Sequence, residues 1–545
     1  MYVDYAADCV LTATCQPDMI DVVLFESESR ATNKNSNKNQ MAHKLLMIPG
    51  PVEFDAEVLS AMATPATGHV DPAFITKFGS SLEMLRSVFY APTGQPFVIA
   101  GSGTLTWDAT AANLVESGDN VLVVNTGVFG DWFAECIGVY GGLVDSVRAP
   151  FGDRPSLAQI ETALAAKKYK LITVTHVDTS TGVLNNIDDI CALVKRVSPE
   201  TLIALDGVCS VGAEIIKQEE WGIDVVMTGS QKALGVPPGL AIMVVSKRAL
   251  DVALNRKSAP STYFASFKKW LPIMQKYESR QPSYFATPPV QLILALHVAL
   301  TQLVAAQTTL EVRFAEHRAA SKRVKDTLES WGLRIVPVRR ECAANTLTAV
   351  YYPSGISAGE FLPKVAAKGV LLAGGLHPEH AGKYFRVGHM NVSVMHGALN
   401  GHLDTTLNAI QTALQECGYK LGQYILCAVT QHLSGARSRL TSDLFLFLAI
   451  ATEPKKQRSS VQLKNPFWGS DILVYVLSLD RGMAALCCPG TGTAFDLSKT
   501  YALKRGRRPH FVSFGAFTVS AVAAKIVAST AARTAACIAA PATSF

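Results

Sequence analysis

Short apolar runs alternate with amphipathic segments through the middle of the chain. The predicted strands lie at 121–124, 143–147, 171–176 and 201–206, and the predicted helices at 131–140, 156–166 and 186–197. Strands that are apolar throughout and alternate with helices are typical of a parallel sheet buried under helices. The pattern therefore predicts an α/β domain, which we place at residues 44–285.

A lysine follows the next apolar run. The run 225–229 is followed by Ser230-Gln231-Lys232, then by a turn that ends in Pro-Pro-Gly, and then by the apolar run 240–245. This predicts strand, loop, strand, with Lys232 at the end of the first strand. Apolar surroundings disfavour the charged form of a lysine and free its amine to form an imine. A solvated surface lysine beside a turn is the competing interpretation.

The position of Lys232 in the predicted sheet favours the functional interpretation. Ligands of parallel sheets bind at the carboxyl ends of the strands. Asn125, Thr179 and Asp206 also follow or end predicted strands at this edge. We therefore expect these side chains to lie close to Lys232.

A small-residue turn at 101–104 is a candidate phosphate site. It reads Gly101-Ser102-Gly103-Thr104, follows a predicted strand and opens an alanine-rich helix. Backbone amides at a helix start, together with a hydroxyl group, form a cradle for phosphate. Such turns are also common as purely structural features, so the motif needs support from elsewhere.

The pattern changes after residue 285 and predicts a smaller second α/β domain, which we place at 286–421. One long helix is predicted at 290–328 and further helices at 357–368 and 399–417, with strands at 333–338, 347–352 and 384–388. Residues 1–43, polar and low in complexity, are predicted to be a disordered extension, and 422–545 an atypical extension that is disordered or mispredicted.

Charge and composition exclude some classes of function. The chain is 49% hydrophobic and 17% charged with a net charge of +6. Residues 422–545 hold 14 basic and 5 acidic residues, whereas 42–421 are neutral overall. A neutral central region gives no electrostatic footprint for nucleic acid. The apolar stretch 511–524 is too short to span a membrane. We therefore expect neither nucleic acid nor a membrane as a partner. The 11 cysteines include no CxxC pair, so we predict no metal site, and the compartment stays open.

Three features together fit pyridoxal phosphate chemistry. Asp206 lies 26 residues before Lys232, where a carboxylate would keep a pyridine nitrogen protonated. Lys232 would hold the cofactor and move protons, while 102–104 and Gln231 would bind its phosphate. Phe129 would lie flat on the ring. Each residue also has a structural interpretation: Asp206 as a strand-end cap, Phe129 as a core aromatic, Thr179 as a turn hydroxyl.

The motifs resemble those of class V pyridoxal-phosphate aminotransferases, over about residues 44–420. The segments that carry the resemblance are Ile48-Pro49-Gly50-Pro51-Val52, Gly101-Ser102-Gly103-Thr104, Asp178-Thr179-Ser180-Thr181-Gly182, Asp206-Gly207-Val208-Cys209-Ser210, Gly229-Ser230-Gln231-Lys232-Ala233-Leu234, Pro237-Pro238-Gly239, Tyr284-Phe285-Ala286-Thr287-Pro288-Pro289 and Tyr384-Phe385-Arg386-Val387-Gly388. They are most similar to those of the alanine–glyoxylate and serine–pyruvate aminotransferases. The resemblance implies fold type I, a large domain with a mostly parallel seven-stranded sheet and a smaller C-terminal α/β domain.

The resemblance also implies a role for each matching residue. Lys232 is the Schiff-base lysine and Asp206 pairs with the ring nitrogen. Ser102, Gly103, Thr104 and Gln231 bind phosphate, while Phe129 and Thr179 contact the cofactor. Arg386, Gly50 and Thr179 line the substrate site, with Arg386 binding the carboxylate. Tyr284 and Thr287 reach the phosphate of a partner subunit, which implies a homodimer with shared active sites. Phe129 stands where animal members have tryptophan, and Thr104 where some relatives have histidine.

The implied reaction is a ping-pong transfer of the amino group of alanine to glyoxylate, through the pyridoxamine form, with small amino acids and 2-oxo acids as substrates. Serine–pyruvate or serine–glyoxylate transamination on the same site is the nearest alternative. A desulfurase would need a mobile catalytic cysteine late in the chain, and neither Cys342 nor Cys417 lies in a convincing loop. A non-catalytic scaffold is disfavoured by the presence of Lys232, Asp206 and Arg386 together.

Overall fold

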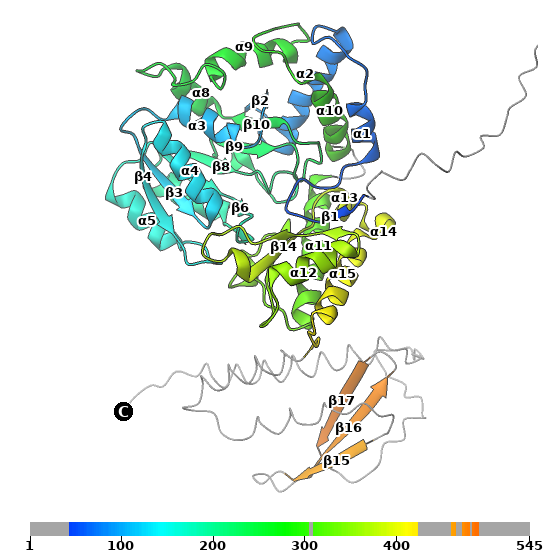
Figure 1. Cartoon of the computed structure of the whole chain (residues 1–545). Coiled ribbons are helices and arrows are strands. Elements are labelled where there is room, and N and C mark those ends of the chain that lie inside the picture. The colour runs from blue at the N-terminus through cyan, green and yellow to red at the C-terminus, as the bar shows by residue number, and fades with distance from the viewer. Residues whose placement is uncertain (1–42, 305–308, 423–458, 465–470, 480–481, 490–545) are drawn as a thin grey trace, which may run out of the picture. The chain divides into compact units, whose positions relative to one another are not determined.

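The computed structural model describes residues 43–304, 309–422, 459–464, 471–479 and 482–489. Its central element is a seven-stranded sheet of order β2-β10-β9-β8-β5-β3-β4 (Figure 1). The strands are β2 Gln95–Ala100, β3 Asn120–Asn125, β4 Leu143–Arg148, β5 Leu171–Thr175, β8 Leu202–Asp206, β9 Val225–Gly229 and β10 Leu240–Val245. Only β10 runs antiparallel to its neighbours, which confirms the predicted mostly parallel sheet.

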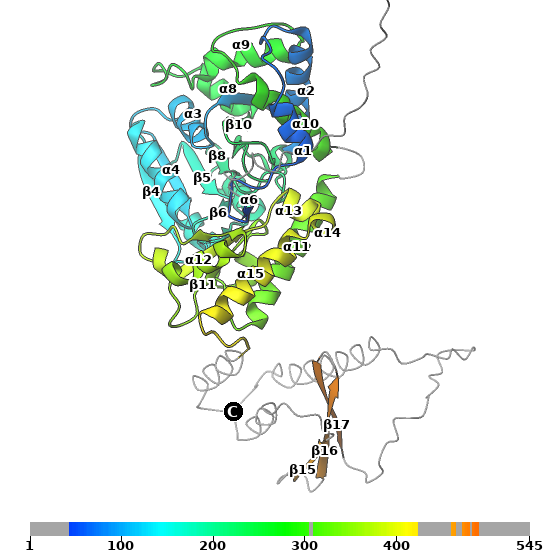
Figure 2. The ribbon, with the colours of Figure 1, turned by 45° about the vertical axis from the view of Figure 1, so that its right-hand side comes forward.

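Helices pack on this sheet around one large apolar core. They are α1 Ala56–Met62, α2 Pro72–Val88, α3 Leu105–Leu114, α4 Val128–Val139, α5 Leu157–Ala166, α6 Ile187–Val197, α7 Gln218–Trp221, α8 Lys247–Leu254, α9 Phe267–Glu278 and α10 Val290–Val304. Local sequence sets several starts: Asp71 caps α2 ahead of Pro72, and Ser156 and Gln159 form a capping box on α5. Figure 2 shows α2 beside α10.

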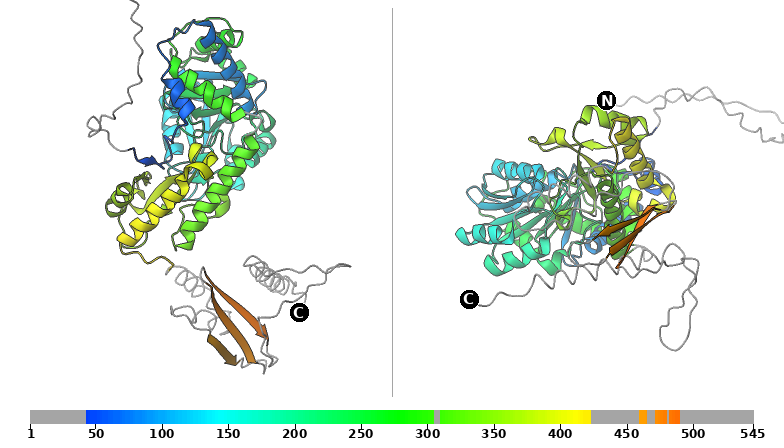
Figure 3. Two further views of the ribbon diagram at one scale, coloured as in Figure 1. Left: turned by 90° about the vertical axis from the view of Figure 1, so that its right-hand side faces the viewer. Right: turned by 90° about the horizontal axis from the view of Figure 1, so that it is seen from below.

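A second apolar core lies in the C-terminal part of this unit. A three-stranded antiparallel sheet of order β11-β14-β13 lies against it. The strands of this sheet are β11 Leu347–Tyr351, β13 Ala373–Gly374 and β14 Tyr384–Gly388. The helices of this part are α11 Leu310–Ser330, α12 Ala358–Ala367 and α15 His402–Glu416. In Figure 3 the yellow α15 lies beside the green α11. The strand β1 Leu45–Leu46 pairs in parallel with β12 Val370–Leu371, so the first described residues join this second part.

Shorter elements complete the two parts. They are β6 Val177–Asp178, β7 Val183–Leu184, the 3-10 turns η1 Arg340–Cys342 and η2 Ala381–Lys383, and the single-turn helices α13 Val392–Met395 and α14 Gly397–Asn400. We predicted neither the 3-10 turns η1 and η2 nor the helices α8 and α9.

Three predictions for the C-terminal part are wrong. The single helix 290–328 is two helices, because Thr309 is extended and its side chain caps α11 through Val312 N–H. The strand at 333–338 is reduced to a bridge between Ile335 and Val350. The last helix begins at His402 rather than 399, because Gly401 has a left-handed backbone (φ +63°) that separates α14 from α15.

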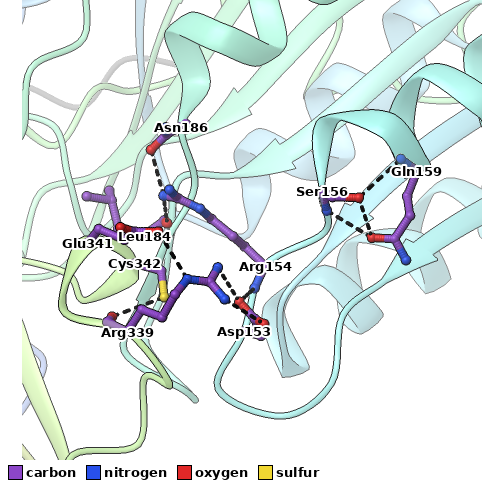
Figure 4. A network of polar contacts seen from close by, with 9 residues as sticks. All are labelled: Asp153, Arg154, Ser156, Gln159, Leu184, Asn186, Arg339, Glu341 and Cys342. Carbon is purple, nitrogen blue, oxygen red and sulfur yellow. Dashed lines mark hydrogen bonds and ion pairs between the residues drawn. The ribbon is translucent and has the colours of Figure 1, made fainter. Parts of the chain in front are cut away.

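A polar network fastens the second part to the first (Figure 4). Arg339, before η1, binds both carboxylate oxygens of Asp153, with its terminal nitrogens at 2.8 and 3.1 Å. Arg154 donates to the Leu184 carbonyl at 2.9 Å and to Asn186 at 2.6 Å. A bidentate guanidinium–carboxylate pair fixes orientation as well as distance. The network thus holds the chain near β7, which follows the motif at 178–182, in one position.

Part of the extension at 422–545 contains strands that we did not predict. β15 Ser459–Lys464, β16 Asp471–Leu479 and β17 Gly482–Pro489 form an antiparallel sheet of their own. Of the predicted disordered extension 1–43, residues 1–42 lie outside the described residues, as do residues 490–545. Within the described part of the chain, no helix is long and apolar enough to cross a membrane. The boundaries 44–285 and 286–421 remain predictions.

Candidate active site

The carboxyl edge of the sheet brings Asp206 and Lys232 to one place. Asp206 is the last residue of β8 and pairs in register with Thr175 and Met227 on the neighbouring strands. Lys232 follows the end of β9 by three residues. Parallel strands end at the same edge of a sheet, and both residues lie there as the sequence predicts.

Asp206 is a buried carboxyl group with an altered acidity. The residue is 3% exposed, and the Val208 N–H donates to Oδ1 at 2.9 Å. Burial raises the pKa of Asp206 to about 6, and the nearby Asp178 carboxyl adds to this rise; the Val208 N–H, Trp107 and the Lys232 ammonium oppose it. A cationic partner for this carboxylate would therefore be strongly stabilised.

Lys232 lies against the first described loop of the chain. Its Nζ donates to the Pro49 carbonyl oxygen, to which the Cys209 thiol is also directed at 3.8 Å. Gly50 has φ +104°, and a Cβ there would lie 2.3 Å from Cδ and 2.6 Å from Nζ of the lysine. Gly50, predicted to line the substrate site, is thus in direct contact with Lys232.

The turn at 101–104 forms a cradle beside the end of β9. Ser102 and Thr104 are exposed where α3 begins, and Gly103 packs against the backbone of Gly229. A Cβ on Gly103 would lie 3.2 Å from Val208 Cγ2, and one on Gly229 would lie 2.8 Å from Gln231 Oε1. The N–H groups that open α3 are already bonded within the turn: Leu105 N–H donates to the Ser102 carbonyl and Thr106 N–H to the Gly103 carbonyl, both at 3.0 Å. The small residues of the turn at 101–104 leave room for an anion near the Gln231 amide.

One buried oxygen beside this cradle, Gln231 Oε1, has no hydrogen-bond partner among the described residues. Buried polar groups are normally hydrogen-bonded. A bound phosphate would accept a hydrogen bond from the Gln231 amide, once that group is turned to present its NH₂.

Phe129 is the second residue of α4, and its ring meets that of Trp107 edge-on, with 6.4 Å between the ring centroids. The turn before α4 is held by Ser180, whose hydroxyl accepts from Val128 N–H at 3.0 Å and donates to Asp178 at 2.5 Å. Burial raises the pKa of Asp178. The rigid turn fixes the half-buried Phe129 ring as one wall of the site.

Arg386 lies in the middle of β14 and reaches the same region from the second part. Its Nε donates to the Gly374 carbonyl at 2.8 Å and Nη1 to the Thr179 carbonyl at 3.1 Å. Burial lowers the pKa of this guanidinium. No carboxylate of the described residues pairs with it, so the remaining N–H groups are available to a carboxylate ligand.

Tyr284 and Thr287 are not brought to Lys232 within one chain. Both are exposed in the segment between α9 and α10, Tyr284 to 62%. The Tyr284 hydroxyl lies 3.3 Å from that of Thr287, and its ring packs on His69 at 5.1 Å. Neither side chain contacts the other candidate residues of the site.

Sequence reasoning missed four groups of the site. The Pro49 carbonyl and Cys209 lie within motifs that we quoted, but backbone acceptors and small side chains give no signal of their own. Trp107 follows the 101–104 turn by three residues. Arg313 is buried on α11 and bonds the carbonyl of Ala233, the residue after Lys232. Its helix pattern is that of an ordinary charged face.

The residues fit pyridoxal phosphate. The buried Asp206 carboxyl, which has no ion pair among the described residues, would meet the ring nitrogen, and the cradle with the orphaned Gln231 oxygen would meet the phosphate. Lys232 follows both in sequence and lies at the same sheet edge. The buried Cys342, on η1, donates to the Arg339 carbonyl, and Cys417 caps α15; neither supports the desulfurase alternative.

Comparison with known proteins agrees with this fit. The sequence profile of the family Aminotransferase class-V matches residues 64–393. Alanine–glyoxylate aminotransferase 1 of Saccharomyces cerevisiae is 42% identical over 382 residues, 68% of this chain and 97% of that protein. Serine–glyoxylate aminotransferase of Arabidopsis thaliana is 30% identical over 380 residues, covering 69% and 91%.

A solved structure is similar as well. The crystal structure of an alanine–glyoxylate aminotransferase from Nostoc sp. has a TM-score of 0.63 and 30% identity, and the match covers 69% of this chain and 96% of that one. The chain therefore belongs to the class V aminotransferases and is a pyridoxal-phosphate-dependent enzyme of that family.

Proposed function

We propose that the enzyme transfers the amino group of alanine to glyoxylate, giving pyruvate and glycine, with ping-pong kinetics. The observation that carries the proposal is Arg386, a half-buried guanidinium without a carboxylate partner among the described residues. One such group suits substrates with a single carboxylate. Both relatives are named as glyoxylate aminotransferases, which supports glyoxylate as the acceptor here.

Each proposed role follows from the contacts of the residue. When bound, pyridoxal phosphate supplies an electron sink for the α-carbon of the amino acid. The Asp206 carboxylate would hold the ring nitrogen protonated, because burial leaves it in need of a positive partner. The Lys232 amine would take the α-proton and return it, and its contact with Gly50 keeps the amine on the substrate side. Arg386 would bind the carboxylate through two parallel hydrogen bonds.

Ser102, Gly103, Thr104 and Gln231 would bind the phosphate in the cradle described above. Phe129 would stack on the ring, held by the Asp178–Ser180 turn. Thr179 contributes its backbone carbonyl to Arg386, so its part in substrate binding is to orient the guanidinium. These are the roles that the contacts of each residue favour.

We also propose that the working unit is a homodimer with shared active sites. Tyr284 and Thr287 are exposed in the single chain, although their hydroxyl groups lie 3.3 Å apart as if to bind one ligand together. A twofold axis would present this pair to the cradle of a second subunit.

Serine is the second candidate donor, favoured by the similarity to the serine–glyoxylate enzyme of Arabidopsis thaliana. Steady-state kcat/KM values with alanine, serine and aspartate, each against glyoxylate, separate the candidates. We expect alanine to give the highest value. Activity with serine alone would replace our proposal with the alternative.

The test of the reaction class is the absorbance of the purified protein. The wild type loaded with cofactor should absorb in the visible range and lose that band when L-alanine is added, and glyoxylate should restore it. Lys232→Ala should lack both changes. A wild type that stays colourless with added cofactor would overturn the proposal.

A further inference from the structure

A buried arginine lies beneath Lys232. Arg313, in the first turn of α11, is 4% exposed. Its Nε donates to the Gly212 carbonyl at 3.3 Å and Nη2 to the Ala233 carbonyl at 3.2 Å. Burial lowers its pKa to about 10, so the group stays charged at neutral pH. It forms no ion pair with any described residue.

The two carbonyls belong to the two turns that hold the catalytic candidates. Gly212 lies in the turn that follows Asp206, and Ala233 directly follows Lys232. A planar guanidinium with donors in a fixed fork bridges both turns at once. Because charge-assisted bonds to buried carbonyls are stronger than neutral ones, Arg313 fixes the spacing of these turns.

The next turn of α11 contributes a second polar residue, His317, which contacts Arg313 and Asn391. His317 is fully buried, and its Nδ1 lies 2.7 Å from the Arg313 carbonyl. Its Nε2 accepts from the Asn391 N–H at 3.2 Å. The ring is therefore neutral, with the proton on Nδ1. Asn391 has φ +51°, and its Nδ2 lies 1.5 Å from where a Cβ on Gly235 would be. We call Arg313, His317 and Asn391 the polar clamp.

The polar clamp connects the part of the site that holds Arg386 to the part that holds Lys232. Asn391 follows β14, the strand of Arg386, and Gly235 closes the turn of Lys232 through its N–H on the Lys232 carbonyl at 2.8 Å. Farther along α11, Val324 and Leu328 are part of the second apolar core. A rigid helix thus connects the core behind Arg386 to the turn of Lys232.

We propose that Arg313 is a positioning residue, which sets the place of the Lys232 amine relative to Asp206 and Arg386. This deepens the proposed transamination and rests on it. Loss of the guanidinium would leave two carbonyls without donors and free the Lys232 turn. A misplacement of about 1 Å costs on the order of 100-fold in rate.

The test compares Arg313→Met and Arg313→Lys with Arg318→Met, whose arginine is exposed on the same helix. We expect Arg313→Met to lower kcat about 100-fold with a smaller change in the KM for alanine. The visible circular dichroism per bound cofactor should fall, because the ring is held less firmly. Arg313→Lys should recover part of kcat and part of the visible circular dichroism, since the lysine can still bond one carbonyl. Arg318→Met should match the wild type.

Hydrogen exchange in the cofactor-free protein provides a readout that does not depend on the reaction. Amides of residues 230–236 should exchange at least several-fold faster in Arg313→Met than in Arg318→Met. Should Arg313→Met fail to fold, Asn391→Gly, which keeps the left-handed backbone and removes the side chain against Gly235, should raise the same exchange. Unchanged exchange in a folded Arg313→Met or in Asn391→Gly overturns the positioning role, whereas a wild type without transaminase activity overturns the proposed function.

Discussion

Gly50 and Lys232 are in such close contact that a single methyl group between them would overlap the lysine. A Cβ on Gly50 would lie 2.3 Å from Lys232 Cδ, and φ +104° strains any other residue at this position. The loop at 48–52 therefore determines where the amine lies. This contact joins a residue near the start of the described chain to one that follows β9.

We expect Gly50→Ala to disable catalysis while the protein stays folded. The added methyl must push the lysine aside, and a misplaced amine should lower kcat about 100-fold. The measurement is steady-state kcat with alanine and glyoxylate, together with circular dichroism for the fold. Gly68→Ala, where a Cβ meets nothing within 4 Å, is the matched control. Equal rates for the two variants would show that the contact is unimportant.

Asp206→Asn should stabilise the cofactor-free protein at neutral pH. Burial raises the pKa of Asp206 to about 6 in the folded state, above its unfolded value near 4. Protonation therefore favours folding, and this contribution is complete below about pH 4 and is lost as the pH rises through 6. At pH 7 the asparagine variant should gain on the order of 3 kcal/mol over wild type.

Urea unfolding of both cofactor-free proteins from pH 4 to pH 8 measures this difference. The gain should shrink toward pH 4. Bound cofactor should reverse the order, because the wild-type carboxylate then has a cationic partner that asparagine does not match. A difference that is constant with pH would contradict the assignment of the raised pKa to Asp206.

Arg386→Ala should weaken substrate binding without loss of cofactor. Removal of a buried charge-assisted pair costs about 2–5 kcal/mol, which predicts a large rise in KM for both alanine and glyoxylate. The visible absorbance of the cofactor should remain, since Arg386 contacts only the Gly374 and Thr179 carbonyls. Arg386→Lys should show an intermediate KM, because an ammonium binds a carboxylate through one point. An unchanged KM would exclude the carboxylate role.

The parts of the fold that could be predicted are those set by burial of the central strands or by the carboxyl edge of the sheet. The central strands are apolar on both faces, so their burial and parallel order could be derived before the structure was known. The meeting of Asp206 and Lys232 follows from the same rule, because both come after buried parallel strands. Arg386 needed the family resemblance, since a charged residue within a strand has several ordinary explanations.

Features that depend on tertiary contacts could not be derived in this way. The start of α11 depends on a cap by Thr309, within a run that otherwise has helical character. The burial of Arg313 is invisible in sequence, because its partners are carbonyls, which every residue has. The strand predicted at 333–338 failed since its neighbours offer only one bridge. Pairing partners are not encoded in a local alternation of residues.

Tyr284 and Thr287 lead to a prediction that tests the shared active site directly. Lys232→Ala and the double variant Tyr284→Ala/Thr287→Ala should each be nearly inactive alone. If the two sets of residues act in different subunits, a mixed dimer has one site in which both are intact. After random re-association about half of the dimers are mixed, so the mixture should regain about one quarter of the wild-type activity.

The mixture must be unfolded or dissociated together and then reassembled, with each variant treated alone as the control. Sites built within one chain would regain nothing, because every chain then has one defect. Tyr284 and Thr287 are exposed in the single chain, where Tyr284 packs on His69 and its hydroxyl lies 3.3 Å from that of Thr287, which is why we expect recovery. Recovery would place the phosphate of each site between two subunits, and it would explain why a tyrosine and a threonine lie paired on an open surface.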